Sequence, residues 1–514
     1  MRRLTIIATL LVMTSCMAAV RLHTYDEPLE MDAATYAVIA REMLVGRSLY
    51  SDLWDHKPPA IHATFVVAQV VAGAGPAHTF LLGLLAASIA LVGVYAATAA
   101  MAGQRVGLLG AAIWTLVSAD MMLRANQPNT EAFINAVLVW AFAGLVTIPL
   151  THYAWTRAVC IGLLLALASL YKHVALATGI VLLAAHFYAV SASPAARRRA
   201  AAQVSIAIAV VTISWSGVCA YFSISGRWDA FWNAVFTFNR QYAGSTWDNV
   251  ANALVLDQLI APALYPLLPL LVLTILGLLT GGPPARRRGR ALLTAYAIGT
   301  VLAVALPGRF SPHYYQLWLP LLAIGGAVGV AALRPVVFSE RVWLGRAGAV
   351  ILAVLVVVEL PALTLDPQEW SRRKFGERLL ESEATARTLN GLLLRDETFF
   401  QWGPTAELYY YSGRRVPGGE FRSDHLLSAA DGPRRTARLV DALTRQPPEL
   451  VLVSRWHAFP PDHPVPRWLM ERYAKVDSIG GAMPGHNYDV WVRRGGALEG
   501  RLAAGVLASA QRTS

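Results

Sequence analysis

The side chains that could carry chemistry are charged residues at the edges of long apolar segments. Asp32 lies in the string EMDAATYAVIAREML, where apolar residues recur at helical spacing. Lys57 precedes two prolines in DHKPP, and Glu131 begins an apolar segment in NQPNTEAF. A carboxylate can act as a general base, and a lysine can stabilise a phosphate. Because ionisable groups near membrane depth are often functional, these residues are candidates for one site.

Each candidate also has a structural explanation. A carboxylate in the first turn of a helix, such as Asp32 or Glu131, stabilises that helix as a cap or through the helix dipole. The prolines fix the backbone and hold Lys57 in an extended conformation before the next helix. A lysine in that position can reach the lipid headgroups. The sequence alone supports capping and catalysis about equally for Asp32.

The composition indicates a polytopic helical membrane protein. Of 514 residues, 55% are hydrophobic and only 15% are charged, whereas soluble domains have ~25% charged residues. Apolar runs recur as far as residue 364, and ~20 apolar residues span a bilayer core. The runs predict about eleven transmembrane helices. They are 4–20, 78–101, 106–122, 132–150, 154–170, 174–190, 203–222, 258–279, 291–307, 314–333 and 347–364.

The arginines predict the orientation of these spans. They gather in short loops, for example at 197–199 and 286–290, which are therefore expected to be cytoplasmic, together with the N-terminus. A protein that binds nucleic acid would gather them on one surface, so the net charge of +12 does not indicate such a partner. If the apolar stretch 60–75 also crossed the bilayer, the number of crossings between the N-terminus and residues 197–199 would be odd, and the two could not both be cytoplasmic. We therefore expect 60–75 to lie in or dip into the outer interface.

The chain is expected to divide into two domains. Residues 1–364 form the transmembrane domain, with a first outer loop at 21–77. Residues 365–514 have ordinary globular composition, and ETFFQWG, ELVLVSR and YDVWVRR are typical of strands. With helical stretches at 376–394 and 433–445, they predict a small α/β domain. The parity of the spans places this domain and the long outer loops outside the cytoplasm.

Two further outer segments have predicted structures. The string EMDAATYAVIAREML at 30–44 predicts an amphipathic helix on the membrane surface. The aromatic-rich segment 227–244 predicts an interfacial helix, whose rings are alternatively placed to stack on a sugar.

Four strings resemble one known family. MDAATYAVIAREML, DHKPP, NQPNTEAF and GRFSPHYYQLWLP follow the order seen in polyprenyl-phosphate-dependent glycosyltransferases of the GT-C superfamily. The pattern is most similar to glycosyltransferase family 39, which holds the protein O-mannosyltransferases and the lipid A aminoarabinose transferases. The resemblance covers about 30 to 330 and is most specific in the first two strings.

The resemblance implies roles for particular residues. Asp32, four residues before Tyr36, matches the aspartate proposed as the catalytic base. Lys57 matches the lysine that contacts the donor phosphate, and Glu131 matches a second acid that, like Tyr36, is expected to bind substrate. The sequence departs from the family where Ala33 follows Asp32 instead of a second acid.

The remaining candidates lie in other outer turns or beside Lys57. We expect Lys172 and Arg309 to add positive charge at the donor phosphate. We expect His56, His313 and Tyr314 to contact substrate, although the family often has Glu in place of His56. No spacing of metal ligands is visible, so no cofactor is predicted with certainty.

The departures from the family pattern leave metal binding open. A divalent cation near Asp32, His56 and Glu131 stays an alternative to a site without metal.

Together these features predict a membrane glycosyltransferase. A sugar on a polyprenyl phosphate already has a good leaving group, so only the acceptor hydroxyl needs a base. One base opposite a phosphate site implies inversion at the sugar carbon. The expected partners are the lipid-linked donor, membrane lipid and a glycan, lipid or protein acceptor. The protein is expected to be a multi-pass protein of the inner (plasma) membrane, with its active site outside the cytoplasm. The alternatives are a flippase or transporter of lipid-linked glycans and a non-enzymatic envelope scaffold.

Overall fold

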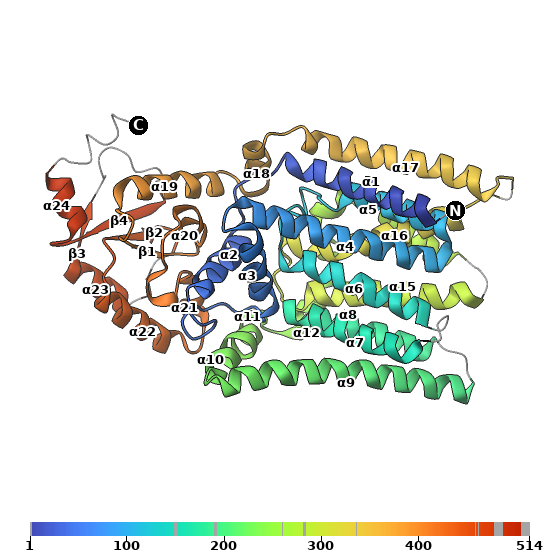
Figure 1. Ribbon diagram of the computed structural model, residues 1–514, viewed down its shortest axis with the longest axis horizontal. Coiled ribbons are helices and arrows are strands. Elements are labelled where there is room, and N and C mark those ends of the chain that lie inside the picture. Colours follow the sequence, from blue (N-terminus) through green and yellow to red (C-terminus); the bar gives the residue numbers. More distant parts are fainter. Residues whose placement is uncertain are drawn as a thin grey trace.

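The protein consists of a bundle of long, nearly parallel helices and a smaller mixed domain at one end of it (Figure 1). The computed structural model describes residues 3–148, 153–189, 193–259, 261–280, 284–335, 337–457, 459–460, 462–476 and 487–504. The bundle contains α1 (Arg3–Leu22), α4 (Pro76–Ala102), α5 (Gln104–Val117), α6 (Thr130–Thr147), α7 (Ala154–Tyr171), α8 (Ala175–Tyr188), α9 (Pro194–Ile224), η3 (Pro262–Leu267), α14 (Leu268–Leu279), α15 (Pro284–Ala305), η4 (Pro312–Leu317), α16 (Trp318–Ala332) and α17 (Glu340–Leu363).

Every predicted span coincides with a helix of this bundle. Within the described residues, seven helices are long and apolar enough to cross a membrane: α1, α4, α6, α7, α9, η4 with α16, and α17. The apolar helices α5, α8, η3 with α14, and α3 (Ala60–Ala72) are shorter. The predicted fold class of a polytopic helical membrane protein is thus confirmed, whereas the number eleven stays a prediction.

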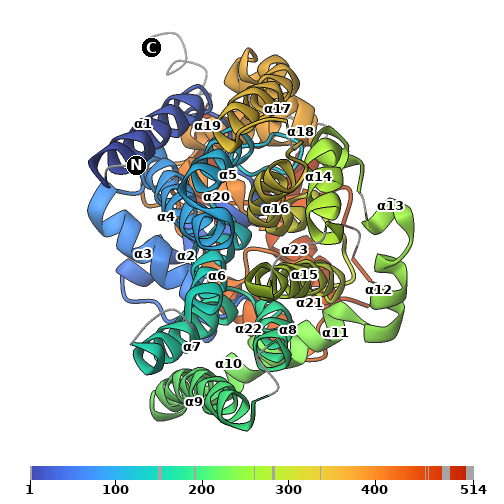
Figure 2. The ribbon, with the colours of Figure 1, turned by 90° about the vertical axis from the view of Figure 1, so that its right-hand side faces the viewer.

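The long axes of the bundle helices lie along one direction, so the bundle has one end beside the mixed domain and one end far from it (Figure 1). The N-terminus lies at the end far from the mixed domain, and α9 runs from that end toward α10 (Trp228–Trp232) beside the mixed domain (Figure 1). The arginines 197–199 begin α9, so they lie at the same end as the N-terminus. The view along the bundle shows its helices end-on, with α9 and α1 at its periphery (Figure 2).

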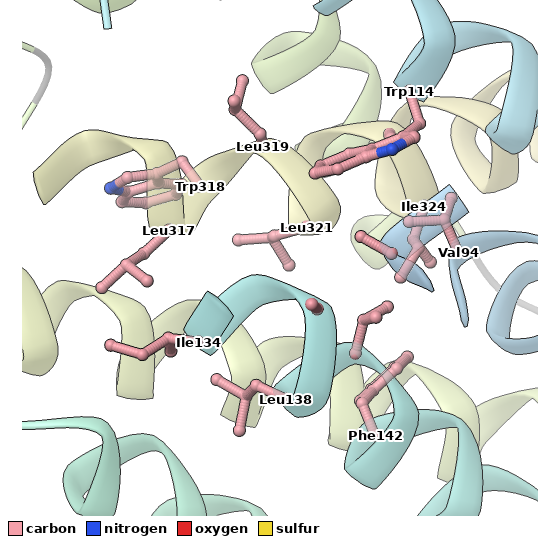
Figure 3. Packing of buried hydrophobic residues seen from close by; sticks show 14 of the residues in the cluster. Val94, Trp114, Ile134, Leu138, Phe142, Leu317, Trp318, Leu319, Leu321 and Ile324 are labelled. Carbon is pink, nitrogen blue, oxygen red and sulfur yellow. The ribbon is translucent and has the colours of Figure 1, made fainter. Parts of the chain in front are cut away.

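Large apolar side chains fill the interior of the bundle. Figure 3 shows Ile134, Leu138 and Phe142 of α6 below Leu321 of α16, with Trp114 of α5 nearby. All of these side chains are buried. Small residues bring helices close, as they often do in membranes. A Cβ atom on Gly329 of α16 would lie 2.0 Å from the Leu273 carbonyl oxygen of α14.

The mixed domain is built around a four-stranded sheet in the order β1-β2-β4-β3. Strand β1 (Phe399–Trp402) is parallel to β2 (Leu450–Ser454), and β4 (Tyr488–Arg493) is antiparallel to both β2 and β3 (Tyr473–Val476). Three strands were expected, and β3 was not. The helices of the mixed domain are α18 (Pro367–Phe375), α19 (Arg378–Leu392), α20 (Glu407–Ser412), η5 (Pro417–Gly419), α21 (Asp424–Ser428), α22 (Gly432–Arg445), α23 (Pro464–Arg472) and α24 (Ala497–Ala503).

The first outer loop forms a layer between the bundle and the mixed domain (Figure 1). Its helices are α2 (Met31–Leu44) and α3. The prediction that α2 lies amphipathically on the membrane surface is wrong, because α2 packs against both α3 and α20. Even Glu42, on its polar face, is fully buried, where Arg47 and Arg415 pair with it.

The aromatic segment 227–244 folds beside this layer. It comprises α10, the π-helical turn η2 (Asn233–Phe238) and α11 (Asn239–Ala243), and α12 (Thr246–Ala253) and α13 (Leu256–Leu259) follow it. Phe231, Val235 and Phe238 are buried against residues of the first outer loop and the mixed domain. The segment therefore packs against the first outer loop and the mixed domain through these side chains.

Candidate active site

Asp32 lies in the first turn of α2 and does not cap that helix. Glu30 occupies the capping position without a side-chain cap. The Asp32 carboxylate instead accepts a hydrogen bond from Arg422 of the mixed domain, with Oδ1 and Nη1 3.3 Å apart. The capping interpretation of Asp32 is therefore wrong, and its carboxylate is directed at a cation that comes from another domain.

Four cations or potential cations surround Asp32. Burial works to raise the pKa of Asp32, but Lys57, Arg422, His313 and His56 outweigh it and hold that pKa well below its usual range. The carboxylate is therefore ionised at neutral pH. An ionised carboxylate is the form that accepts a proton from a hydroxyl.

The DHKPP string forms a chain of polar contacts next to Asp32. The Lys57 Nζ atom lies 3.2 Å from His56 Nε2, and His56 Nδ1 lies 3.3 Å from Asp55 Oδ1. Burial, followed by the neighbouring Lys57 charge, lowers the pKa of His56. A neutral His56 ring with its proton on Nδ1 toward Asp55 would leave Nε2 to accept from Lys57. The string thereby fixes the position of the Lys57 ammonium group.

Neighbouring residues hold the backbone of this string. The Tyr50 hydroxyl donates to the Lys57 carbonyl oxygen at 2.7 Å, and the Asn239 side chain donates to the His56 carbonyl oxygen at 2.7 Å. Pro59 then serves as the residue before α3, with a φ of −72°. The expectation that the prolines stiffen the start of this helix agrees with that geometry.

Tyr36 is buried and lies one turn along α2 from Asp32. Its ring packs edge-on against His62 at 5.7 Å and Phe65 at 5.6 Å between centroids. Burial, with the nearby charges of Asp32 and Asp55 after it, raises the pKa of Tyr36 well above its usual value. The neutral phenol therefore positions α2 against α3.

A second ion pair lies across the site. Lys172, in the turn between α7 and α8, donates from Nζ to Glu131 Oε1 at 2.7 Å. The same Nζ atom stands 3.4 Å above the centre of the Tyr314 ring. Glu131 also accepts from the Thr130 hydroxyl at 2.9 Å. The Glu131 and Lys172 side chains are both buried, so each compensates the charge of the other.

The two remaining candidates are His313, which acts on both Asp32 and Glu131, and Arg309. His313 Nδ1 is 3.9 Å from Glu30 Oε1, which places it near the start of α2. Arg309 donates to the Tyr242 carbonyl oxygen at 3.0 Å, and its guanidinium group lies 4.0 Å from the centre of the Tyr242 ring.

Four of the nine candidate residues line a cavity of about 340 Å³. Its walls include His56, Lys57, Lys172 and Tyr314, together with Phe236 of the aromatic segment. Tyr242 is also part of the wall, and Arg309 lies against it.

Neither Asp32 nor Glu131 lines the cavity, but the charge of each interacts with that of a lysine that does. Lys57 lowers the pKa of Asp32, and Lys172, which contacts Glu131, lines the cavity. The structure thus brings these acids and lysines of the candidate site to one region, and Tyr36 lies behind it.

Three residues of this region were missed by the sequence reasoning. Asp55 and His62 support His56, and the Asp55 and His62 side chains approach to 3.2 Å. Asp55 belongs to the DHKPP string, whereas His62 lies seven residues later on α3, so no helical spacing relates the two. Arg422 carries no sequence signal either, because it reaches the site from a distant part of the sequence.

The described residues contain no group of three or more His, Cys, Asp or Glu side chains arranged to hold a metal ion. Asp32 faces Arg422, and His56 faces Asp55 and Lys57. Because these partners are mostly cations, the region does not present the oxygen ligands that divalent cations such as Mg²⁺ prefer.

Solved structures share this architecture. ArnT from Cupriavidus metallidurans in the apo state has a TM-score of 0.60 at 16% identity, over 95% of this chain and 97% of that chain. The same protein bound to undecaprenyl phosphate gives 0.59 at 15% identity, with the same coverage. The archaeal oligosaccharyltransferase AglB from Archaeoglobus fulgidus, in complex with an inhibitory peptide and a dolichol-phosphate, gives 0.53 at 12% identity, over 87% of this chain and 69% of that chain. No protein-family model and no curated protein matches the sequence. The likeness shows that this chain shares the fold of these structures, in agreement with the predicted fold class.

Proposed function

We propose that this chain, which has the GT-C fold, transfers a sugar from a polyprenyl-phosphate donor to an acceptor hydroxyl. The observation that carries the proposal is that Lys57, a buried lysine lining one cavity, is close enough for its charge to lower the pKa of the carboxylate Asp32. The likeness to a protein solved with undecaprenyl phosphate supports the same class of donor.

The donor phosphate is proposed to lie against Lys57 and Lys172. Both ammonium groups belong to cavity-lining residues, and a phosphate leaving group needs compensation of its charge rather than a general acid. His56 and Asp55 hold the Lys57 side chain in place. The cation is therefore positioned before the donor arrives, which lowers the cost of binding.

Asp32 is proposed to remove the proton from the acceptor hydroxyl. The acceptor oxygen forms a bond to the sugar carbon as the bond from that carbon to the phosphate oxygen breaks. The proton goes to Asp32, and the electron pair leaves with the polyprenyl phosphate. Because the base and the leaving group lie on opposite sides of the sugar carbon in this arrangement, the configuration inverts.

The outer face of the inner (plasma) membrane is the proposed location of this reaction. The arginines at the start of α9 lie at the end of the bundle opposite the candidate site. By the positive-inside rule, that end is cytoplasmic. The acceptor is then a glycan, lipid or protein outside the cytoplasm, and the domain 365–514 faces it.

The alternatives predict a different distribution of residues. A flippase or transporter is expected to carry polar residues near the middle of broken helices. A scaffold gives no reason for Asp32, Lys57 and Glu131 to gather at one cavity. The ends of the helices, where these residues lie, suit an enzyme that works at the membrane surface.

The experiment compares wild-type protein with Asp32→Asn in proteoliposomes. Lipid and glycan extracts of a deletion strain, analysed by mass spectrometry, first identify the missing sugar unit and the acceptor. Asp32→Asn is then expected to lower turnover about 10²- to 10⁴-fold while donor binding persists. A folded Asp32→Asn protein with wild-type turnover would remove Asp32 from the role of base.

A further inference from the structure

A second and larger cavity lies between the first outer loop and the mixed domain. Its volume is about 710 Å³, and we name it the arginine cleft. Five arginines line it: Arg47, Arg415, Arg435, Arg438 and Arg445. Asp52 and Glu420 are the acidic residues in its wall. The cleft therefore has an excess of positive charge, and the reaction proposed above does not use it.

The acidic partners do not neutralise these arginines. Arg47 and Arg415 approach the same carboxylate, Glu42, at 3.1 and 3.0 Å. The Glu42 oxygens also lie within 4.0 Å of Arg41. One buried glutamate thus serves three guanidinium groups, which leaves positive charge at this wall.

The opposite wall, on α22, is also undercompensated. Arg435 is buried and bound through two hydrogen bonds to Glu420, so it builds the wall. Arg445 pairs with Asp441 at the surface, where ion pairs contribute little. Arg438 is exposed and forms no ion pair with any described residue. Arg438 and Arg445 are seven residues apart, so they lie on the same side of the helix.

The wall of the cleft leads directly to the candidate active site. Glu420 lines the cleft, and Arg422, two residues later, contacts Asp32. Two residues of extended chain span about 7 Å, which is comparable to one sugar unit. The Trp54 amide donates to the Gly419 carbonyl oxygen at 3.4 Å, so this wall is attached to the first outer loop.

We propose that the arginine cleft binds an anionic saccharide, one that carries carboxylate or phosphate groups. Guanidinium groups match such groups because they donate paired hydrogen bonds in a plane. This saccharide is part of the acceptor, and that last step rests on the function proposed above. Binding at the cleft itself does not.

Binding is tested with the full chain in nanodiscs of phosphatidylcholine, so that no anionic lipid competes. The probe is tetragalacturonic acid, with uncharged maltotetraose beside it. The double variant Arg438→Glu, Arg445→Glu is expected to weaken tetragalacturonate binding at least tenfold, and to make it less sensitive to salt. The charge-matched control is Arg467→Glu, Arg472→Glu on α23, which does not line the cleft and should bind as wild type does.

Three results would overturn the proposal: no binding of tetragalacturonate, equal binding of maltotetraose, or equal loss in the control variant. An Asp32→Asn protein should retain binding, because Asp32 does not line the cleft. If Asp32→Asn binds tetragalacturonate and the wild type transfers no sugar, the function proposed above fails and the cleft stands. If transfer to neutral and anionic acceptors is equally efficient and the cleft variant changes neither, the acceptor role of the cleft fails and the function stands.

Discussion

Arg422 and Asp32, 390 positions apart in the sequence, share a hydrogen bond of 3.3 Å at the boundary between the membrane domain and the mixed domain. The mixed domain therefore supplies a side chain to the candidate active site. Neither domain alone contains the complete set of charges around Asp32.

Replacing Arg422 should change the pH dependence of the reaction. Arg422 is one of the charges that depress the pKa of Asp32, so Arg422→Gln raises that pKa toward its ordinary value. Because only the ionised carboxylate accepts a proton, the acid limb of kcat/KM should move to higher pH. Arg422→Lys keeps the positive charge, so its acid limb should lie closer to that of the wild type than the acid limb of Arg422→Gln does. An unchanged acid limb in Arg422→Gln would show that this contact does not act on the base.

Lys57→Met should weaken donor binding. A hydrogen bond between charged groups contributes about 1.5–3 kcal/mol, so the Kd for polyprenyl phosphate is expected to rise about 10- to 100-fold. Calorimetric titration with the protein in detergent measures it. The control is Lys475→Met, whose lysine pairs with Asp489 on the exposed side of the mixed domain. Equal affinity in Lys57→Met and Lys475→Met would contradict a phosphate site at Lys57.

The pair of Glu131 and Lys172 should show strong coupling in stability. Glu131→Gln leaves the buried Lys172 ammonium group without its partner, which is expected to lower the free energy of unfolding by about 3–5 kcal/mol. The double variant Glu131→Gln, Lys172→Met should lose less than Glu131→Gln alone. Denaturant unfolding measures both, and simple additivity of the single effects would argue against a compensated buried pair.

Acid should destabilise the protein through His173. Burial, with the charges of His56 and Lys57 after it, lowers the pKa of His173 to about 4. A group with a lowered pKa contributes stability above its unfolded pKa of about 6.5, and this stability is lost as the pH falls toward 4. His173→Phe retains the stacking on Trp215 and removes the proton site. Its Tm should fall less than that of wild type between pH 6.5 and 4; parallel curves would count against the assignment.

Local strings predicted the parts of the site that local geometry fixes. Lys57 and His56 lie within DHKPP, and Asp32 and Tyr36 lie one helical turn apart on α2. Their roles still await the experiments above, but their placement beside each other follows from short spacing and from the order of the membrane helices.

Tertiary contacts decided what the sequence could not show. The polar face of α2 predicted exposure to solvent, yet Arg41 donates to the carbonyl oxygens of Tyr409 and Arg414, from α20 and the turn after it. Such partners leave no trace in the periodicity of residues 30–44. Strand β3 was missed for a similar reason: its four residues form a strand only because β4 pairs with them.

The contact between the mixed domain and α2 has a consequence for the order in which the protein is assembled. Residues 409–422 are synthesised long after α2, so Asp32 acquires Arg422 only after all the helices of the bundle have been made. A nascent chain that stalls before this point carries its membrane helices but lacks the Arg422 partner of Asp32. The surroundings of Asp32 are therefore complete only once the mixed domain has folded against α2.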